Sequence, residues 1–165
     1  GVEWSKENYV GGYTSYGSAA DLNHRYPSFS ELCSLIDKHK AAFIRQLQWR
    51  AKDVEMEMSS CWINVMRNKS HHSFHIHPMS VLSGTLFLSS PRGASPFRIQ
   101  DPRIGFFMNR PQTLKNSKFQ PIFEVEPQDG LLVLFESWLS HEVPANKGKE
   151  ERISLSFNYR WDPST

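Results

Sequence analysis

Two histidines separated by a single residue suggest a metal site. The segment SFHIHPMSVLSG, residues 73 to 84, places His75 and His77 in a run of β-forming residues. On a β-strand, residues i and i+2 project to the same face, so the two imidazoles lie about 6–7 Å apart along the strand. Neutral imidazole is a common metal ligand. The spacing predicts that both histidines bind one ion, although an exposed pair of strand histidines needs no metal.

A metal site of this kind needs at least one more ligand from a neighbouring strand. His141 is the candidate, because it follows closely on the apolar strand GLLVLF in the segment ESWLSHEV. Three neutral imidazoles would then form one side of the site. We therefore predict a metal centre made of His75, His77 and His141.

Eleven residues after His141, the segment RISLSF begins with Arg152 and has Ser154 two positions later. On a strand these two side chains share a face. Arginine offers a planar pair of donors to a carboxylate, and the serine hydroxyl adds a third hydrogen bond. The pair is suited to an organic acid bound inside a barrel. The alternative is an arginine at the rim in a surface ion pair.

The bulk composition indicates one globular domain spanning residues 1–165. The chain is 39% hydrophobic and 22% charged, with a net charge of +2, and 165 residues are enough to bury a core without disulfides. No apolar run approaches the ~18 residues that span a bilayer, and scattered basic residues argue against nucleic-acid binding. We expect no nucleic acid or membrane partner, and Cys33 and Cys61 as buried free thiols.

The compartment is only weakly constrained. Residue 1 is Gly and not Met, which is typical of a processed or recombinant form. We expect a soluble protein of the cytoplasm, or of an organelle after removal of a transit peptide. A homodimer is compatible with the sequence.

The elements that would position these side chains fall into three segments. Residues 1–27 are rich in Gly, Ser and Tyr and are expected to form an extended arm with a short edge strand. Residues 28–50 have apolar residues at helical spacing after a Ser28-x-x-Glu31 capping box, which predicts one long helix covering a sheet.

From residue 59 to 160 the hydrophobic period changes to two, which predicts about seven or eight strands. The strand-like segments are CWINVMR, SFHIH, LSGTLFLSS, PFRIQD, FQPIFEVE, GLLVLFE and RISLSFNYRW. Because no second helical pattern intervenes, the fold class is mainly β, an antiparallel jelly roll or double-stranded β-helix of the cupin-like kind. The irregular stretch 101–118 is expected to be a functional lid.

Several of these pieces, taken in order, resemble a branch of the 2-oxoglutarate and Fe(II)-dependent oxygenases. They are HIH at 75–77, LSG at 82–84, DPR at 101–103, GLLVLFESWLSH at 130–141 and RISLSFN at 152–158. The resemblance covers roughly residues 59 to 160. It implies a double-stranded β-helix, a mononuclear Fe(II) site and 2-oxoglutarate as co-substrate. The implied activity is a hydroxylating dioxygenase that releases succinate and CO2.

Carried over by position, His75 matches the first histidine of the family's His-x-Asp/Glu…His triad, and His141 matches the distal one. Arg152 and Ser154 match the Arg-x-Ser that binds the far carboxylate of 2-oxoglutarate. The departure is His77, which stands where the triad has a carboxylate. A third imidazole leaves the metal charge at +2, and a dianionic co-substrate would offset it.

Five further residues flank these motifs and are candidates to line the pocket: Trp62, Asn64, Ser83, Ser137 and Trp138. His71 and His72 are expected in a solvated turn. A small-molecule or peptide substrate is the expected partner. Two alternatives stay open: a three-histidine cupin-type metal enzyme that does not use 2-oxoglutarate, and a non-catalytic metal-binding module. Arg152 distinguishes the oxygenase from the cupin-type enzyme, because it should face the metal in the oxygenase and need not in the cupin.

Overall fold

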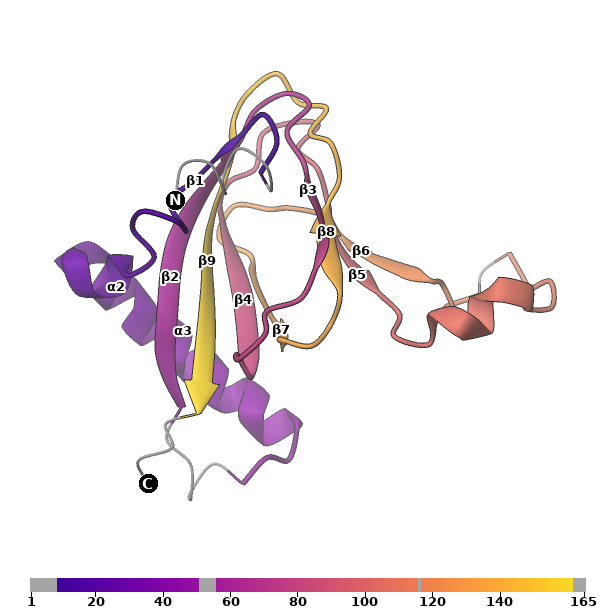
Figure 1. Ribbon diagram of the computed structural model, residues 1–165, viewed down its shortest axis with the longest axis horizontal. Helices are drawn as coiled ribbons and strands as arrows, with labels where there is room; N and C mark the ends of the chain where they lie inside the picture. The colour runs from indigo at the N-terminus through magenta and orange to yellow at the C-terminus, as the bar shows by residue number, and fades with distance from the viewer. Residues whose placement is uncertain (1–8, 51–55, 116, 162–165) are drawn as a thin grey trace.

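The computed structural model describes residues 9–50, 56–115 and 117–161, and in this part of the chain two antiparallel sheets face each other (Figure 1). The first sheet has the order β1-β2-β9-β4-β7 and the second has the order β3-β8-β5-β6. The strands are β1 (Tyr13–Thr14), β2 (Met56–Met66), β3 (His72–His75), β4 (Leu82–Ser89), β5 (Phe97–Gln100), β6 (Ile122–Val125), β7 (Leu132–Glu136), β8 (His141–Val143) and β9 (Arg152–Trp161). This arrangement confirms the predicted jelly roll.

Alternation along the central strands gives the five-stranded sheet two different faces. On β9, Leu155, Phe157 and Tyr159 are completely buried on one side of the strand. Arg152 and Ser154 alternate with them and face the second sheet, as successive strand residues must. The period-two pattern therefore separates an apolar outer face from a polar face that lines the space between the sheets.

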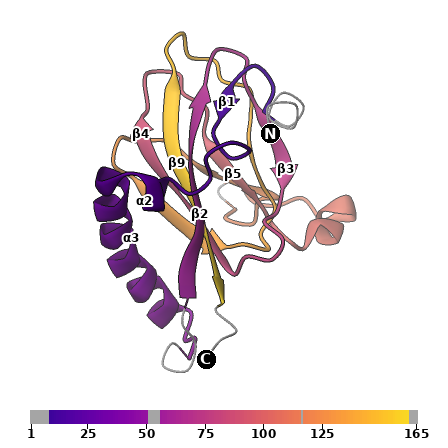
Figure 2. The same ribbon diagram turned by 60° about the vertical axis from the view of Figure 1, so that its left-hand side comes forward.

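Helix α3 (Pro27–Gln46) covers the outer face of the five-stranded sheet (Figure 2). Its buried Cys33 and Ile36 join the same core cluster as Leu155 and Phe157. The predicted capping box does not form: Pro27 is already helical, and the N-cap residue Tyr26 makes no side-chain capping bond. Proline suits the first turn because its missing N–H would have no helical partner there. The helix ends at Gln46, four residues before the predicted boundary.

The N-terminal segment reaches the sheet through β1, which pairs with β2 at Tyr13↔Val65 and Thr14↔Asn64. This confirms the expected edge strand, while residues 1–8 lie outside the described residues. A short helix, α2 (Leu22–Arg25), leads into α3. Cys33 and Cys61 are buried free thiols, as predicted, with their Sγ atoms 3.8 Å apart. None of the helices in the described part of the chain has the length and apolar character needed to cross a bilayer.

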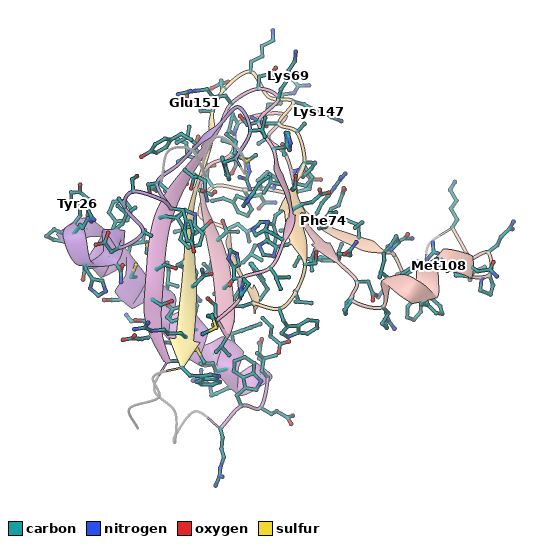
Figure 3. The ribbon with its side chains drawn as sticks, in the orientation of Figure 1. Tyr26, Lys69, Phe74, Met108, Lys147 and Glu151 are labelled. Carbon is teal, nitrogen blue, oxygen red and sulfur yellow. The ribbon has the colours of Figure 1, made fainter. Side chains whose placement is uncertain are left out.

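The long insertion between β5 and β6 extends away from the two sheets instead of covering them (Figure 1). It contains a 3-10 helix, η1 (Ile104–Asn109), near its far end. Figure 3 shows Met108 on this projection, well separated from the body of the molecule. No described residue of 101–118 lines the cavities beside the histidines. The prediction that this stretch forms a lid is therefore wrong for this structure.

Candidate metal centre and acid-binding cavity

The three predicted histidines converge between the sheets. One ligand atom from each of His75, His77 and His141 can be chosen so that all three lie within 4.8 Å of one another. The imidazole centroids of His75 and His141 are 4.2 Å apart, because these two residues are opposite each other in the β3–β8 pair. The His77 ring is 5.1 Å from that of His75 and 5.0 Å from that of His141.

His77 does not lie on the strand that was predicted to carry it. Strand β3 ends at His75, and His77 is held in the following segment by its backbone N–H, which donates to the Ser137 carbonyl at 3.1 Å. Its ring also packs edge-on against Trp62, with the centroids 6.0 Å apart. The prediction of two side chains on one strand face was therefore wrong in detail, although both rings reach the same cluster.

Backbone carbonyls orient two of the three imidazoles. The Nδ1–H of His75 donates to the Ser73 carbonyl at 2.8 Å, and the Nδ1–H of His141 donates to the Leu139 carbonyl at 2.8 Å. A carbonyl oxygen only accepts, so these bonds place the proton on Nδ1 and leave each Nε2 with a lone pair. A second hydrogen bond of this kind is the usual way in which proteins fix a metal-binding histidine.

Burial keeps these imidazoles uncharged. It lowers the pKa of His77 and of His141 to about 3, with smaller contributions from neighbouring histidines. Burial also lowers the pKa of His75. Because only neutral imidazole has a lone pair for a metal, the cluster is ready to bind an ion at neutral pH without first losing protons.

Two side chains that sequence reasoning did not select also belong to this region. His72 stacks on His75 with the ring centroids 3.9 Å apart, and Tyr9 packs against His72 at 4.9 Å. The expected solvated turn at His72 is wrong, since this residue begins β3 and burial lowers its pKa to about 3. No local signal identifies Tyr9, because it reaches the site through a contact distant in sequence.

Arg152 is buried beside the histidines, and none of the described residues forms an ion pair with it. Its side chain is only 1% exposed, and its guanidinium carbon lies 4.8 Å from the centre of the Phe87 ring. Its Nη1 is 3.4 Å from the Met66 sulfur, and its Nε has no hydrogen-bond partner among the described residues. A buried cation is costly unless an anion pairs with it. This environment is suited to a bound carboxylate.

Two adjoining cavities share the histidine cluster. The inner cavity, of about 40 Å³, is lined by Arg152 and Ser154 together with the three histidines. The outer cavity, of about 240 Å³, is lined by His75 and His77 but not by Arg152. Six residues line both cavities: Tyr9, Trp62, Asn64, His72, His75 and His77. A ligand held at Arg152 would therefore extend toward the histidines.

The other predicted pocket residues differ in position. Trp62 and Asn64 line both cavities. Ser83 and Ser137 are not among the residues that line either cavity, and they form a buried chain in which their Oγ atoms are 2.7 Å apart. The Ser83 hydroxyl also donates to Asn158 Oδ1 at 2.8 Å. Trp138 is 54% exposed and lies outside both linings.

The donor set fits Fe(II). Imidazole nitrogen is a good ligand for iron, and two nitrogens bound to one ion at ~2.1 Å are at most ~4.2 Å apart. The observed limit of 4.8 Å is slightly larger, so small side-chain rotations would bring the three nitrogens into range. The inner cavity beside them leaves room for further ligands of the ion.

Two antiparallel sheets that face each other over such a cluster are the arrangement of a double-stranded β-helix with a candidate metal centre. Residues 60–158 match the model of a family described as "Putative 2OG-Fe(II) oxygenase", and the chain belongs to this family. The match includes every metal-ligand candidate together with Arg152 and Ser154. No curated protein matches the chain at the level of sequence.

The same fold occurs in several solved structures. HygX from Streptomyces hygroscopicus, solved with nickel and 2-oxoglutarate, is 14% identical with a TM-score of 0.61, covering 92% of this chain and 70% of HygX. A prolyl-4-hydroxylase from Pseudomonas putida is 19% identical with a TM-score of 0.55, covering 81% of this chain and 65% of that one.

The third is an oxidoreductase of the 2OG-Fe(II) oxygenase family from Burkholderia pseudomallei. It is 19% identical with a TM-score of 0.51, covering 67% of this chain and 47% of that one. The chain thus spans about half of the Burkholderia protein and about two thirds of the Pseudomonas enzyme. At these identities the likeness establishes the fold.

Proposed function

We propose that the chain is an Fe(II)- and 2-oxoglutarate-dependent oxygenase that hydroxylates an organic substrate. In this proposal His75, His77 and His141 bind the iron, and Arg152 with Ser154 binds the far carboxylate of 2-oxoglutarate. Bound there, Fe(II) would supply the oxidative chemistry in which dioxygen, 2-oxoglutarate and a substrate C–H bond give succinate, CO2 and a hydroxylated product.

The observation that carries the proposal is the isolation of Arg152. Within the described residues no carboxylate forms an ion pair with it, yet it is almost completely buried and lines the same cavity as the three histidines. A dianionic acid bound there would neutralise the guanidinium at one end and reach the metal at the other. Ser154 lies two residues further along β9 on the same face and supplies a hydroxyl donor.

In this chemistry the protein's own residues orient the metal-binding imidazoles and keep water away from the Arg152 guanidinium. The carbonyls of Ser73 and Leu139 hold the rings of His75 and His141, so the Nε2 atoms are aimed before a metal binds. The Phe87 ring and the Met66 thioether surround the Arg152 guanidinium with weakly polar groups. A low dielectric strengthens the attraction between this cation and a bound carboxylate.

The outer cavity is the proposed place of the substrate. Its lining contains the aromatic rings of Tyr9 and Trp62 and the amide of Asn64, and no Asp, Glu, Lys or Arg is present among its described residues. Such a wall favours an uncharged group that packs on rings and exchanges a few hydrogen bonds. The substrate is therefore a small molecule or a peptide that presents an uncharged portion to the metal.

A three-histidine cupin-type enzyme without 2-oxoglutarate remains the second candidate, since the ligand set alone would serve it equally well. It does not account for a buried arginine in the cavity beside the ligands. Binding of 2-oxoglutarate separates the two candidates directly.

The test is an anaerobic titration of the Fe(II)-loaded protein with 2-oxoglutarate, followed by visible absorbance and by calorimetry. We expect a metal-to-ligand charge-transfer band in the wild type. In Arg152→Ala the dissociation constant for 2-oxoglutarate should increase by about 30-fold or more, which corresponds to the ~2–5 kcal/mol lost with one partner of a buried charge pair.

The matched control is Arg67→Ala, which removes an exposed arginine that pairs with Glu151 on the surface. This variant should bind 2-oxoglutarate like the wild type. Absence of the band in the wild type, or equal binding by Arg152→Ala and Arg67→Ala, would contradict the assignment. Succinate release in air, with and without candidate substrates, then measures turnover.

A further inference from the structure

The segment that projects from the two sheets into solvent carries an unusual amount of exposed apolar surface. We call residues 97–125 the arm; it consists of β5, η1 and β6, and residue 116 is outside the described residues. Figure 1 shows the arm extending beyond the rest of the molecule, and Figure 3 shows Met108 on it, far from the body. Met108 and Leu114 are 90% and 86% exposed.

Three phenylalanines add to this surface. Phe106, Phe119 and Phe123 are 57%, 61% and 65% exposed. An aromatic side chain carries ~150–250 Å², so the three together leave roughly 300–450 Å² in contact with solvent. The largest apolar patch on a typical monomer is about 300–600 Å². With Met108 and Leu114 included, the arm reaches or exceeds that range.

The arm also presents an open strand edge. Strand β6 is the last strand of its sheet within the described residues, so one side of its backbone has no strand partner there. An exposed edge with an apolar residue such as Phe123 is a site at which another strand can add. An identical strand can pair with it in the antiparallel sense about a two-fold axis, which is the commonest symmetry of homo-oligomers.

Charge on the arm favours such a two-fold arrangement. Residues 104–120 contain Arg110, Lys115 and Lys118 but no Asp or Glu, whereas Glu126 and Asp129 follow β6. Glu124 within β6 is already paired with Arg98 of the same chain. In an antiparallel pair, residues before β6 in one copy run beside residues after β6 in the other copy. The basic part of each arm would therefore lie along the acidic segment that follows β6 in the other copy.

From the exposed apolar area, the open edge and this charge distribution, we propose that the arm is the interface of a homodimer in which two copies pair along β6. A stable interface of standard size buries about 800 Å² on each partner, and the apolar side chains of the arm supply a large part of that area. The arm begins with the strand next to the histidine cluster, because β5 pairs with β8 at Ile99↔His141. Pairing of two arms would not require iron or 2-oxoglutarate to be bound.

The test measures the mass of the purified chain in solution by light scattering and by sedimentation over a range of concentrations. We expect a wild-type dimer with twice the 19.1 kDa mass of the chain. Phe123→Lys should raise the dimer dissociation constant about tenfold or more, since it removes an apolar contact and places two cations near the axis. Met108→Lys provides a second variant at a position that is 90% exposed.

Leu35→Lys is the matched control, because Leu35 is 49% exposed on α3, on the other side of the molecule. It should remain dimeric, and all variants should keep the wild-type circular dichroism spectrum and iron stoichiometry. Cross-linking adds a positional readout. The two native cysteines are buried, so Phe123→Cys should form an intermolecular disulfide under mild oxidation, whereas Leu35→Cys should not.

A wild-type protein that is monomeric at its highest attainable concentration would overturn the proposal. The same holds for a dimer that Phe123→Lys and Met108→Lys leave intact, or for equal cross-linking at positions 123 and 35. In either of the last two cases another surface would join the copies.

Discussion

At the scale of single residues, His77 stands at the position where the oxygenase motif that the sequence resembles has a carboxylate. The usual carboxylate neutralises one unit of the metal's charge, whereas an imidazole leaves the ion at its full +2. The Trp62 ring packs against His77, and burial lowers the pKa of this imidazole to about 3, so it stays neutral. A more positive ion beside Arg152 would attract a dianionic co-substrate more strongly.

Changing His77→Asp tests this difference. We expect the variant to bind Fe(II) but to bind 2-oxoglutarate about tenfold more weakly or worse, which corresponds to about 1.4 kcal/mol of lost attraction. The anaerobic absorbance titration measures it. His71→Asp makes the same change of charge at a histidine outside the metal cluster and should bind 2-oxoglutarate like the wild type. Equal or tighter binding by His77→Asp would show that the third imidazole does not serve the co-substrate.

At the scale of elements, β4 depends on a glycine where β9 and β7 pack against it. A Cβ at Gly84 would collide with the Phe157 ring and would come within 2.9 Å of Leu134 Cδ2. This close approach explains why a glycine stands in the LSG segment of a strand, where glycine is otherwise unfavourable.

Gly84→Ala should therefore lower the free energy of unfolding by about 1–3 kcal/mol through overpacking. Chemical denaturation with a fluorescence or circular dichroism signal measures the change. Gly105→Ala is the control, because a Cβ there meets nothing within 4 Å. If both alanines were equally well tolerated, Phe157 would have to be mobile enough to move aside.

A chain of buried hydrogen bonds through Ser83 and Ser137 joins β4 to the turn before β8. Ser137 donates through its hydroxyl to Ser83, which in turn donates to Asn158. The Ser137 carbonyl also accepts from the His77 backbone N–H. Ser83 and Ser137 do not line either cavity, but Ser137 positions the segment that carries His77.

Ser137→Ala removes one hydroxyl from this chain and leaves Ser83 short of a donor. We expect a loss of about 1–3 kcal/mol in the free energy of unfolding, the cost of a buried group left without its partner. Ser34→Ala, at an exposed serine of α3, should change stability by less than about 0.5 kcal/mol. Thermal and urea unfolding of both variants measures these two changes in the free energy of unfolding.

At the scale of the whole molecule, the structural core and the metal centre are largely separate. One hydrophobic cluster lies between α3 and the outer face of the five-stranded sheet, with Ile36 and Phe157 among its members. A second cluster, including Phe87 and Phe135, lies on the cavity side and packs closer to the histidines. The first cluster does not contain the ligands, so the fold does not require an ion to bury its main core.

We therefore expect the metal-free protein to remain folded after treatment with a chelator. Adding Fe(II) at about 100 times its dissociation constant should raise the free energy of unfolding by about 2.7 kcal/mol, since the ion binds the native state alone. Differential scanning calorimetry under nitrogen measures the shift. Unfolding of the apoprotein at room temperature, or a shift of equal size in His141→Ala, would contradict this account.

Much of this molecule follows from the sequence, because local patterns report local geometry. The period-two segments predicted β2, β4 and β9 and the two faces of each, since alternation along a strand fixes which side chains share a side. The segment RISLSF identified Arg152 and Ser154 for the same reason, whereas His77 of the motif HIH lies beyond the end of β3 and joins the cluster from the following segment. The helical spacing after Pro27 likewise predicted the covering helix, with an error only at its ends.

Other features depend on contacts between residues far apart in the chain, and only the tertiary structure decided them. Tyr9 and His72 reach the site because β1 and β3 pack beside it, and no local pattern encodes that approach. Ser137 turned out to support His77 instead of lining the cavity, and the 101–118 stretch projects outward instead of closing it. Sequence periodicity specifies which face a side chain takes, whereas its neighbours depend on how the two sheets pack together.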